Sequence, residues 1–198
     1  NLTSLKTVGV TTSSVDTDAL ACTNYYYAVR TIANATLSPN SNSTSAHIVV
    51  PNNLAVLSPN GGEIWQAGIP QHITWISTGC TRPSTVTIEY STNNGVSWTP
   101  ITTTANNGSY TWLLPNIPTS VALVRVHDGS LQDNSNSSFT IAPIPAPTAL
   151  SATPSDVSVG LHWTASTVAG LSGYAVYRGA TSGSLSLLTT LASTATTY

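Results

Sequence analysis

Short strand-like runs separated by turn residues dominate this chain and limit what it can fold into. Examples are HITWIS, VTIEYS, SYTWLL and VALVRV, which are rich in Val, Ile, Thr, Tyr and Trp. Runs of this length, bounded by Gly, Asn or Pro, are typical of strands, and a spacing of roughly 10–20 residues is typical of β-sandwiches. Long apolar runs with helical periodicity do not occur. The pattern therefore predicts an all-β protein.

The composition fits this prediction and narrows the classes of partner. Hydrophobic residues make up 40% of the chain and charged residues only 6%, and Ser and Thr account for 59 of the 198 residues. Such a mixture suits strands joined by short polar turns. With a net charge of −2 and five Lys and Arg, the chain lacks the basic surface that binds nucleic acid. No apolar run of membrane-spanning length is present.

Residues 55–142 form the clearest unit. The segment SPNGGEIWQAG is followed by HITW and then by IEYSTNNG. This order of motifs resembles an immunoglobulin-like module that is common in secreted bacterial and archaeal proteins, and it is similar to the Ser/Thr-rich Kre9/KNH-type domain. The resemblance implies an immunoglobulin-like β-sandwich over residues 55–142. It implies no activity, because sandwiches of this kind carry unrelated functions.

Side-chain alternation and turn residues predict details of this sandwich. Ile73 and Trp75 are expected to face one way on one strand, and Val86, Ile88 and Tyr90 alternate on the next. The Asn-Asn-Gly triplets at 93–95 and 106–108 both predict hairpin turns, because Asn and Gly tolerate the backbone conformation that such turns need.

The two ends of the chain resemble the two halves of one fibronectin type III domain. Residues 148–198 contain VGLHWTAS and GYAVYRG, which match the first half, and residues 1–48 contain NYYYAVRTIA, which matches the second. The resemblance implies a core tryptophan at Trp163 and a tyrosine corner at Tyr25. Before that tyrosine the family often has Pro-Gly, where this chain has Ala21-Cys22. The resemblance places four further residues on strands: Tyr27, Val29, Tyr174 and Tyr177.

The two ends also overlap in sequence. Leu2 aligns with Leu185 and Thr11 with Thr194, which gives a repeat of about 183 residues (185 − 2 = 183). A half-sandwich leaves a sheet edge and half a core exposed. Either each chain completes a domain of its neighbour, or the sequence is one segment of a longer tandem-repeat chain. The absence of Met favours a native N-terminus outside this sequence.

The chain is expected to divide into tandem β-sandwiches, of which the terminal ones are incomplete. Two short linkers separate them, and the second, Pro-rich one is expected to be extended and semi-rigid. The expected segments are half-domain 1–48, linker 49–54, immunoglobulin-like sandwich 55–142, Pro-rich linker 143–147 and half-domain 148–198.

The chain has two cysteines, Cys22 and Cys80. Under the resemblances above, Cys22 lies in the loop before a strand at one pole of its domain. Cys80 lies in the loop between the second and third strands of the middle sandwich, which faces the preceding domain. We therefore expect a Cys22–Cys80 disulfide across the junction, formed in an oxidising compartment. Free thiols or a bridge between chains are the alternatives, and a Cα separation above about 7 Å would rule the disulfide out.

Motifs for catalysis or metal binding are not present. The sequence has no HExxH, CxxC or GxSxG motif and no Gly-rich phosphate loop. The seven carboxylates form no evident acid–base pair, so neither an enzyme nor a cofactor is predicted. Asp128 and Asp133 are weak calcium candidates, and Asp16 and Asp18 are similarly weak. The four histidines are expected to be ordinary strand or surface residues: His47, His72, His127 and His162.

Two further kinds of residue concern sugars: tryptophans that could stack on a sugar ring and asparagines that could carry a glycan. Trp98 and Trp112 are weak candidates for stacking on a sugar ring, and core or cross-strand packing is the favoured explanation for both. Asn-X-Ser/Thr sequons occur about as often as chance predicts, yet most fall in predicted turns, and glycans would compensate for the low charge. The glycosylation candidates are Asn1, Asn34, Asn42, Asn107 and Asn136.

These observations favour a structural or adhesive repeat of an extracellular filament, stalk or surface layer. Half-domains at opposite poles of the middle sandwich would close head-to-tail on neighbouring copies, an open arrangement that generates a filament. The alternative is an accessory spacer or carbohydrate-binding module of a large secreted hydrolase, and a receptor-binding array on a phage or cell surface is a third option. All three place the chain outside a prokaryotic-type cell, as a glycoprotein with no membrane span.

Overall fold

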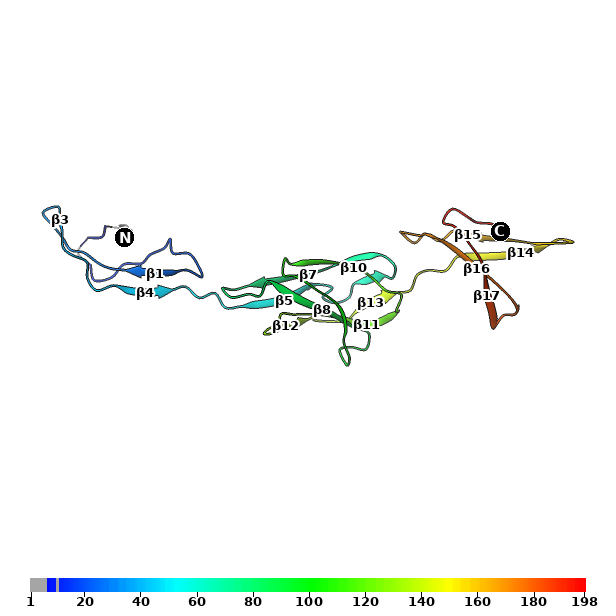
Figure 1. Ribbon diagram of the computed structural model, residues 1–198, viewed down its shortest axis with the longest axis horizontal. Helices are drawn as coiled ribbons and strands as arrows, with labels where there is room; N and C mark the ends of the chain where they lie inside the picture. The colour runs from blue at the N-terminus through cyan, green and yellow to red at the C-terminus, as the bar shows by residue number, and fades with distance from the viewer. Residues whose placement is uncertain (1–6, 10) are drawn as a thin grey trace.

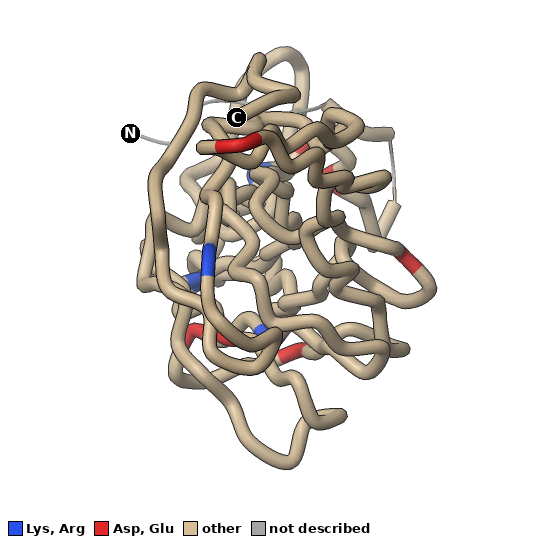
Figure 2. The backbone as a smooth tube through the Cα atoms, turned by 90° about the vertical axis from the view of Figure 1, so that its right-hand side faces the viewer, with Lys and Arg blue, Asp and Glu red and all other residues tan. Residues whose placement is uncertain are grey.

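The computed structural model describes residues 7–9 and 11–198, and these residues form 17 strands and no helix. Figure 1 shows the strands gathered into three units in a row: an N-terminal unit (β1–β4), a middle unit (β5–β13) and a C-terminal unit (β14–β17). The two terminal units lie at opposite ends of an elongated molecule. The prediction of an all-β protein is confirmed. Figure 2 shows how few charged residues the backbone carries, at separated positions.

The strands have the following bounds. The N-terminal unit contains β1 (Asn24–Tyr27), β2 (Ile32–Ala33), β3 (Thr36–Leu37) and β4 (Thr44–His47). The middle unit contains β5 (Asn53–Ser58), β6 (Ile64–Gln66), β7 (Pro70–Thr78), β8 (Thr85–Ser91), β9 (Thr99–Ala105), β10 (Ser109–Leu113), β11 (Thr119–His127), β12 (Gln132–Asn134) and β13 (Phe139–Ala142). The C-terminal unit contains β14 (Thr148–Pro154), β15 (Val159–Thr164), β16 (Gly173–Thr181) and β17 (Ser184–Ala192).

The middle unit consists of two sheets packed on a shared core. One sheet has the order β10-β7-β5, and the other has the order β6-β13-β11-β8-β9, with β12 also paired to β11. All the pairs are antiparallel except β13 with β6, which is parallel. Fifteen buried hydrophobic residues, most of them on the strands of the two sheets, fill the space between the sheets. Burial of this much apolar surface is the main source of stability for such a unit.

The alternation that the sequence predicts is present on β7 and β8. Ile73 and Trp75 are buried and Thr74 between them is only half-buried; likewise Val86 and Ile88 are fully buried, and Tyr90 packs against the same core. Successive strand residues point to opposite faces, so the apolar residues at every second position all reach the interior.

The two Asn-Asn-Gly triplets differ in what they connect. The triplet at 93–95 joins β8 to β9, which pair antiparallel, so the predicted hairpin is confirmed. Its Asn94 and Gly95 have φ values of 56° and 84°, the left-handed region that such a turn requires. The hairpin predicted at 106–108 is wrong. That triplet connects β9 to β10, and β10 pairs with β7 in the opposite sheet. The turn is real, but the hydrophobic faces direct the chain across the core instead of back along β9.

The N-terminal unit is built from two strand pairs, β1 with β4 and β2 with β3. Tyr25 and Tyr27 on β1 are half-buried, whereas Tyr26 between them is exposed. The hydroxyl of Tyr25 accepts a hydrogen bond from the N–H of Leu20 at 3.1 Å. The predicted alternation stops at Tyr27, because β1 ends there and Val29 is exposed. Leu2, used above for the repeat, lies outside the described residues.

The C-terminal unit consists of two hairpins, β14–β15 and β16–β17, which form separate two-stranded sheets. Its core contains Trp163, Tyr174 and Val176, and the rings of Trp163 and Tyr174 lie edge to face with centroids 5.4 Å apart. The implied role of Trp163 as a core residue agrees with its 4% exposure. Tyr174 and Tyr177 both lie on β16, as the motif implies, but Tyr177 is exposed.

The first linker is shorter than the sequence suggests. Strand β5 begins at Asn53, inside the range 49–54 expected for the linker, and Leu54 is buried in the middle core. The run Pro51-Asn52-Asn53 has the composition of a turn, whereas the apolar contact made by Leu54 depends on the tertiary structure. The Pro-rich segment 143–147 carries no strand and lies between β13 and β14.

Candidate functional site: the disulfide-linked junction and the open sheets

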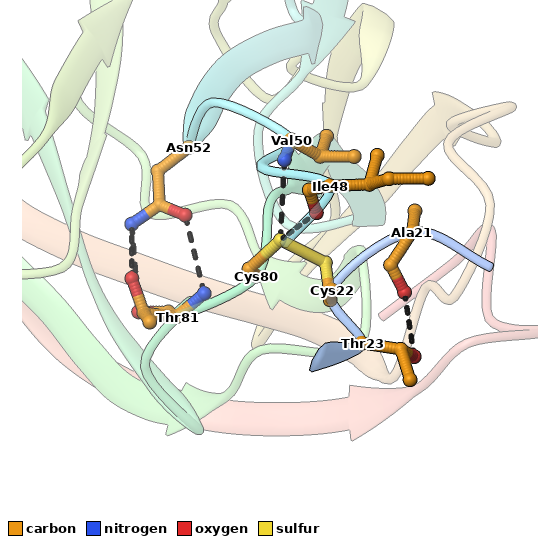
Figure 3. The surroundings of a disulfide bond; sticks show 8 residues. All are labelled: Ala21, Cys22, Thr23, Ile48, Val50, Asn52, Cys80 and Thr81. Carbon is orange, nitrogen blue, oxygen red and sulfur yellow. Dashed lines mark hydrogen bonds between the residues drawn. A yellow bond between two sulfur atoms is a disulfide. The ribbon is translucent and has the colours of Figure 1, made fainter. Parts of the chain in front are cut away.

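A disulfide bond joins the N-terminal unit to the middle unit. Cys22 lies on the turn before β1, and Cys80 lies between β7 and β8. The two residues are 58 positions apart in sequence, and their Cα atoms are 5.1 Å apart. The predicted pairing is therefore present in the structure, across the predicted junction (Figure 3). It uses both cysteines of the chain.

The linker backbone is hydrogen-bonded to both half-cystines. The N–H of Cys22 donates to the carbonyl of Ile48 at 2.8 Å, and the N–H of Cys80 donates to the carbonyl of Val50 at 3.3 Å. The N–H of Val50 donates in turn to Sγ of Cys80 at 3.2 Å. The disulfide thus closes over a linker whose own backbone groups are already paired, which restricts rotation at the junction.

A side-chain pair and a glycine complete the junction. Nδ2 of Asn52 donates to Oγ1 of Thr81 at 2.9 Å, and the N–H of Thr81 donates to Oδ1 of Asn52 at 3.3 Å. Gly79 has a φ of 122°, and a Cβ placed there would lie 2.6 Å from Cα of Asn52. Glycine is needed at position 79 because the linker backbone passes this close.

The second junction has no covalent bridge. The N–H of Ile144 donates to Oδ1 of Asn116 at 3.3 Å, and the side chain of Ile144 packs near Gly68 of the middle unit. On the other side, Oγ of Ser166 donates to the carbonyl of Pro145 at 3.4 Å. This junction therefore depends on the stiffness of its proline-rich backbone and on a few contacts.

Both terminal units contain a strand with one unpaired edge. In the C-terminal unit, β15 pairs with β14 on one edge, and residues 196–198 bond to its other edge: Leu161 N–H donates to Tyr198 at 2.7 Å. Strand β16, by contrast, pairs with β17 alone among the described residues. In the N-terminal unit, β1 likewise pairs only with β4 within the described part of the chain. Unpaired edges of this kind are templates for another strand.

The terminal units bury few apolar side chains and leave many exposed to solvent. The C-terminal unit has three buried hydrophobic residues, against fifteen in the middle unit, and the described part of the N-terminal unit has none. Large apolar residues are correspondingly exposed in both. In the N-terminal unit these are Val8, Val15, Leu20, Tyr26, Val29, Ile32, Leu37 and Ile48, and in the C-terminal unit Leu150, Val157, Val159, Tyr177, Leu185, Leu187, Leu188 and Tyr198.

The two tryptophans considered for sugar stacking lie in different environments. Trp112 is 6% exposed and packs in the middle core, with its ring centroid 5.2 Å from that of Tyr90. Sugar stacking on Trp112 is therefore wrong, because its position on β10 directs it inward. Trp98 is half-buried beside the β8–β9 turn, and the guanidinium of Arg125 lies 4.4 Å from the ring centroid. A sugar-binding role for Trp98 stays a prediction.

The carboxylates of the calcium candidates Asp128 and Asp133 accept hydrogen bonds from backbone N–H groups. Oδ1 of Asp128 accepts hydrogen bonds from the N–H groups of Leu131 and Ser130 at 2.8 and 2.9 Å, and these donors hold the pKa of Asp128 below its ordinary value. Oδ2 of Asp133 accepts from the N–H of Val56 at 2.8 Å. Within the described residues, no three His, Cys, Asp or Glu side chains gather as a metal site would require.

Asp16 and Asp18 also have local roles. Oδ1 of Asp16 accepts from the N–H of Asp18 at 3.0 Å, and its Oδ2 accepts from the hydroxyl of Tyr27 at 3.0 Å. Burial, together with this carboxylate, raises the pKa of Tyr27. The segment before β1 is thereby held over the half-buried face of that strand.

Four of the five sequon asparagines lie on the described surface. Asn34, Asn42, Asn107 and Asn136 are all exposed and outside strands, whereas Asn1 lies outside the described residues. The histidines are spread over separate units: His47 on β4, His72 on β7, His127 on β11 and His162 on β15. The described residues contain no helix long and apolar enough to cross a membrane.

Sequence reasoning missed two polar clusters. Asn106 accepts a bond from Nε1 of Trp75 at 2.8 Å and donates to Ser77 and Pro83, both at 3.0 Å. On the outer face of the β8–β11 pair, Arg125 forms an ion pair with Glu89. The cross-strand register places Glu89 directly opposite Arg125. A sequence signal existed for Asn106 as a turn residue, but its three partners come from separate segments.

The fold is not tied to a family by sequence. A comparison with protein-family models finds no matching family, and a comparison with curated proteins finds no similar sequence. The fibronectin type III and Kre9/KNH-type resemblances therefore stay predictions from motifs.

Proposed function

We propose that this chain is a non-catalytic structural or adhesive repeat of an extracellular filament, stalk or surface layer, whose incomplete terminal units are completed by further copies of the same sequence. The observation that carries this proposal is the contrast between the units. The middle unit has two sheets and a full core, whereas each terminal unit has open strand edges and exposed apolar residues.

The strand pairing of the middle unit supports the immunoglobulin-like part of the proposal. A sheet of order β10-β7-β5 faces a sheet of order β6-β13-β11-β8-β9. The first two strands of the unit belong to different sheets, β5 to the first and β6 to the second. Immunoglobulin-like sandwiches have two antiparallel sheets packed in this way, with sheet-to-sheet connections such as the one at 106–108.

The terminal units support the fibronectin-like part. The hydrogen bond from Leu20 to the Tyr25 hydroxyl has the character of a tyrosine corner, in which the hydroxyl bonds to backbone a few residues upstream. In the C-terminal unit, Trp163 on β15 packs against Tyr174 on β16, as a sandwich core between two facing sheets requires.

The disulfide supports an extracellular location. Disulfides persist in oxidising environments and are rare in reducing cytosol. A bridge at one junction and a proline-rich segment at the other both limit bending, which suits a load-bearing string of sandwiches. The exposed sequons at Asn34, Asn42, Asn107 and Asn136 offer acceptor sites for glycans, which would solvate a surface with few charges.

Assembly of the purified protein tests the proposal. We expect sedimentation velocity to show mass increasing with concentration, and electron microscopy of the assembled fraction to show linear particles. A single species near 20.5 kDa at every concentration would overturn head-to-tail completion between separate chains.

The mass of the native polypeptide under denaturing, reducing conditions then separates the two forms of the proposal. A band near 20.5 kDa, plus any glycan, means subunits that complete each other's units, whereas a band several-fold larger means one long tandem-repeat chain.

A further inference from the structure

The geometry points to a specific contact within the assembly proposed above: β1 of a second copy pairs with the free edge of β16, which produces a composite four-stranded sheet of order β4-β1-β16-β17. This inference rests on the proposed function and adds which strands meet and which faces they cover.

The choice of β16 follows from the edges of the C-terminal unit. Residues 196–198 already bond to one edge of β15, and β14 occupies the other. Among the described residues of this unit, strands β16 and β17 each have an unpaired edge, but β16 contributes the buried core residues Tyr174 and Val176, whereas β17 contributes only the partly buried Leu191. A strand added at that edge would extend the sheet directly over the small core.

The choice of β1 over β4 follows from their side chains. β1 directs the two half-buried aromatic residues Tyr25 and Tyr27 to one face, whereas β4 has the sequence Thr-Ser-Ala-His and is exposed throughout. Aromatic residues supply large apolar contact areas. A short polar strand is suited to the outer edge of a sheet, where it discourages further pairing. With β1 inside and β4 outside, Tyr25 and Tyr27 face the same side of the composite sheet as Tyr174 and Val176.

The C-terminal unit also leaves apolar surface exposed. Apart from Val157 on the β14–β15 turn, seven large apolar residues of this unit are between 38% and 69% exposed. With about 150 Å² for a fully exposed large side chain, they present on the order of 560 Å² of apolar surface. The residues on β17 and on the outer face lie away from the free edge of β16, so the contact proposed here would cover a part of this surface.

A buried donor in the same core also lacks a partner. Nε1 of Trp163 has no hydrogen-bond acceptor among the described residues, although Trp163 is only 4% exposed. Buried N–H groups are almost always paired, because an unpaired one loses its hydrogen bond to water without a replacement. A second layer of backbone over this core would bring acceptors to the place where one is missing.

Cysteine cross-linking between two different variants tests this contact. Tyr26 on β1 and Ala175 on β16 are exposed residues between inward-facing neighbours, so both point to the outer face of the composite sheet. Directly opposite residues on paired strands have Cα atoms about 4.5–5.5 Å apart, within the range of a disulfide. A mixture of the Tyr26→Cys protein and the Ala175→Cys protein is oxidised mildly, and the mixed dimer is quantified by non-reducing electrophoresis and peptide mass spectrometry.

Two further variants set the register and the background. Tyr177→Cys replaces Ala175→Cys for a pairing shifted by two residues, and Val157→Cys, which is 96% exposed on the β14–β15 turn, is the matched control. We expect Tyr26→Cys to form mixed dimers with Ala175→Cys or Tyr177→Cys at least tenfold more than with Val157→Cys. Sedimentation velocity on the same samples reports assembly separately.

The outcomes separate this inference from the proposed function. Assembly without preferential cross-linking to β16 overturns the strand pairing and leaves the proposed function standing. Absence of assembly at all concentrations, with uniformly weak cross-links, overturns both. Preferential cross-links that depend on assembly support both.

Discussion

Cys22 and Cys80 contact the same linker as well as each other: the N–H of Cys22 bonds to Ile48, and the N–H of Cys80 bonds to Val50 two residues later. The bridge and the hydrogen bonds therefore act on one short segment. The N-terminal and middle units, which a flexible linker would otherwise join, are therefore held at a fixed junction.

Replacing both half-cystines, as Cys22→Ser with Cys80→Ser, is expected to loosen this junction. A cross-link that closes a loop of 58 residues is worth about 4 kcal/mol in the chain-entropy model. We expect small-angle X-ray scattering to show a broader distribution of interatomic distances and protease to cleave faster at 49–52. Wild-type protein with a reducing agent should behave in the same way. Identical scattering from all three samples would show that the hydrogen bonds alone hold the junction.

Gly79→Ala is expected to weaken the junction without removing the disulfide. The new Cβ would lie 2.6 Å from Cα of Asn52, and the φ of 122° is itself strained for alanine. Strain of this kind costs about 1–3 kcal/mol. The measurement is the rate of proteolysis within 49–52. Gly183→Ala is the control, because a Cβ at Gly183 meets no atom within 4 Å; equal rates for both variants would contradict the close approach.

Asn106→Ala is expected to destabilise the middle unit, whereas Asn107→Ala is not. Asn106 bonds to Trp75, Ser77 and Pro83, and its loss leaves the indole N–H of Trp75 without its acceptor. An unsatisfied buried group costs about 1–3 kcal/mol. Exposed Asn107 makes one local bond to the N–H of Ser109. Urea unfolding monitored by tryptophan fluorescence gives both values, and similar midpoints for the two variants would count against the Asn106 cluster.

Trp112→Ala and Trp98→Ala are expected to differ in the same assay. Trp112 is 6% exposed and packs on Tyr90, so truncation leaves a large cavity and costs about 3–5 kcal/mol. Trp98 is half-buried beside a turn, so its truncation to alanine should lower the stability clearly less. If Trp98→Ala is the more damaging variant, the stacking of Arg125 on its ring is worth more than the exposure of Trp98 suggests.

Glu63 is expected to make the stability of the middle unit depend on pH in the acid range. Burial opposes its ionisation, but the N–H groups of Asn60 and Gly61, both 2.7 Å from its oxygens, outweigh burial and lower its pKa below the ordinary 4.5. Because the folded pKa is the lower one, ionised Glu63 stabilises the fold above pH 4.5, and this contribution is lost as the pH falls through the folded pKa.

The matching measurement compares wild type with Glu63→Gln in urea unfolding from pH 7 down to pH 3. We expect the wild-type advantage to be constant near neutrality and to shrink below pH 4.5. An advantage that stays constant to pH 3 would contradict the lowered pKa, because it would not depend on the ionisation of Glu63.

The sequence by itself determined the class of fold and much of the local pattern. Alternation on β7 and β8 is a property of neighbouring residues, since side chains at every second position face one side, and Asn94-Gly95 takes the left-handed backbone that a hairpin needs. The pairing of Cys22 with Cys80 was expected from the resemblances, which place both cysteines of the chain at one junction.

Only the tertiary structure decided how faces and edges are used. The turn at 106–108 has the same letters as the one at 93–95, yet it crosses between sheets, because β10 buries Trp112 against β7 and the shared core. Whether a tryptophan such as Trp112 or Trp98 is buried, and which strand edge stays open at β1 and β16, depends on partners that are distant in sequence. The β-propensity of a short segment does not identify these partners, because packing and strand pairing depend on the whole chain.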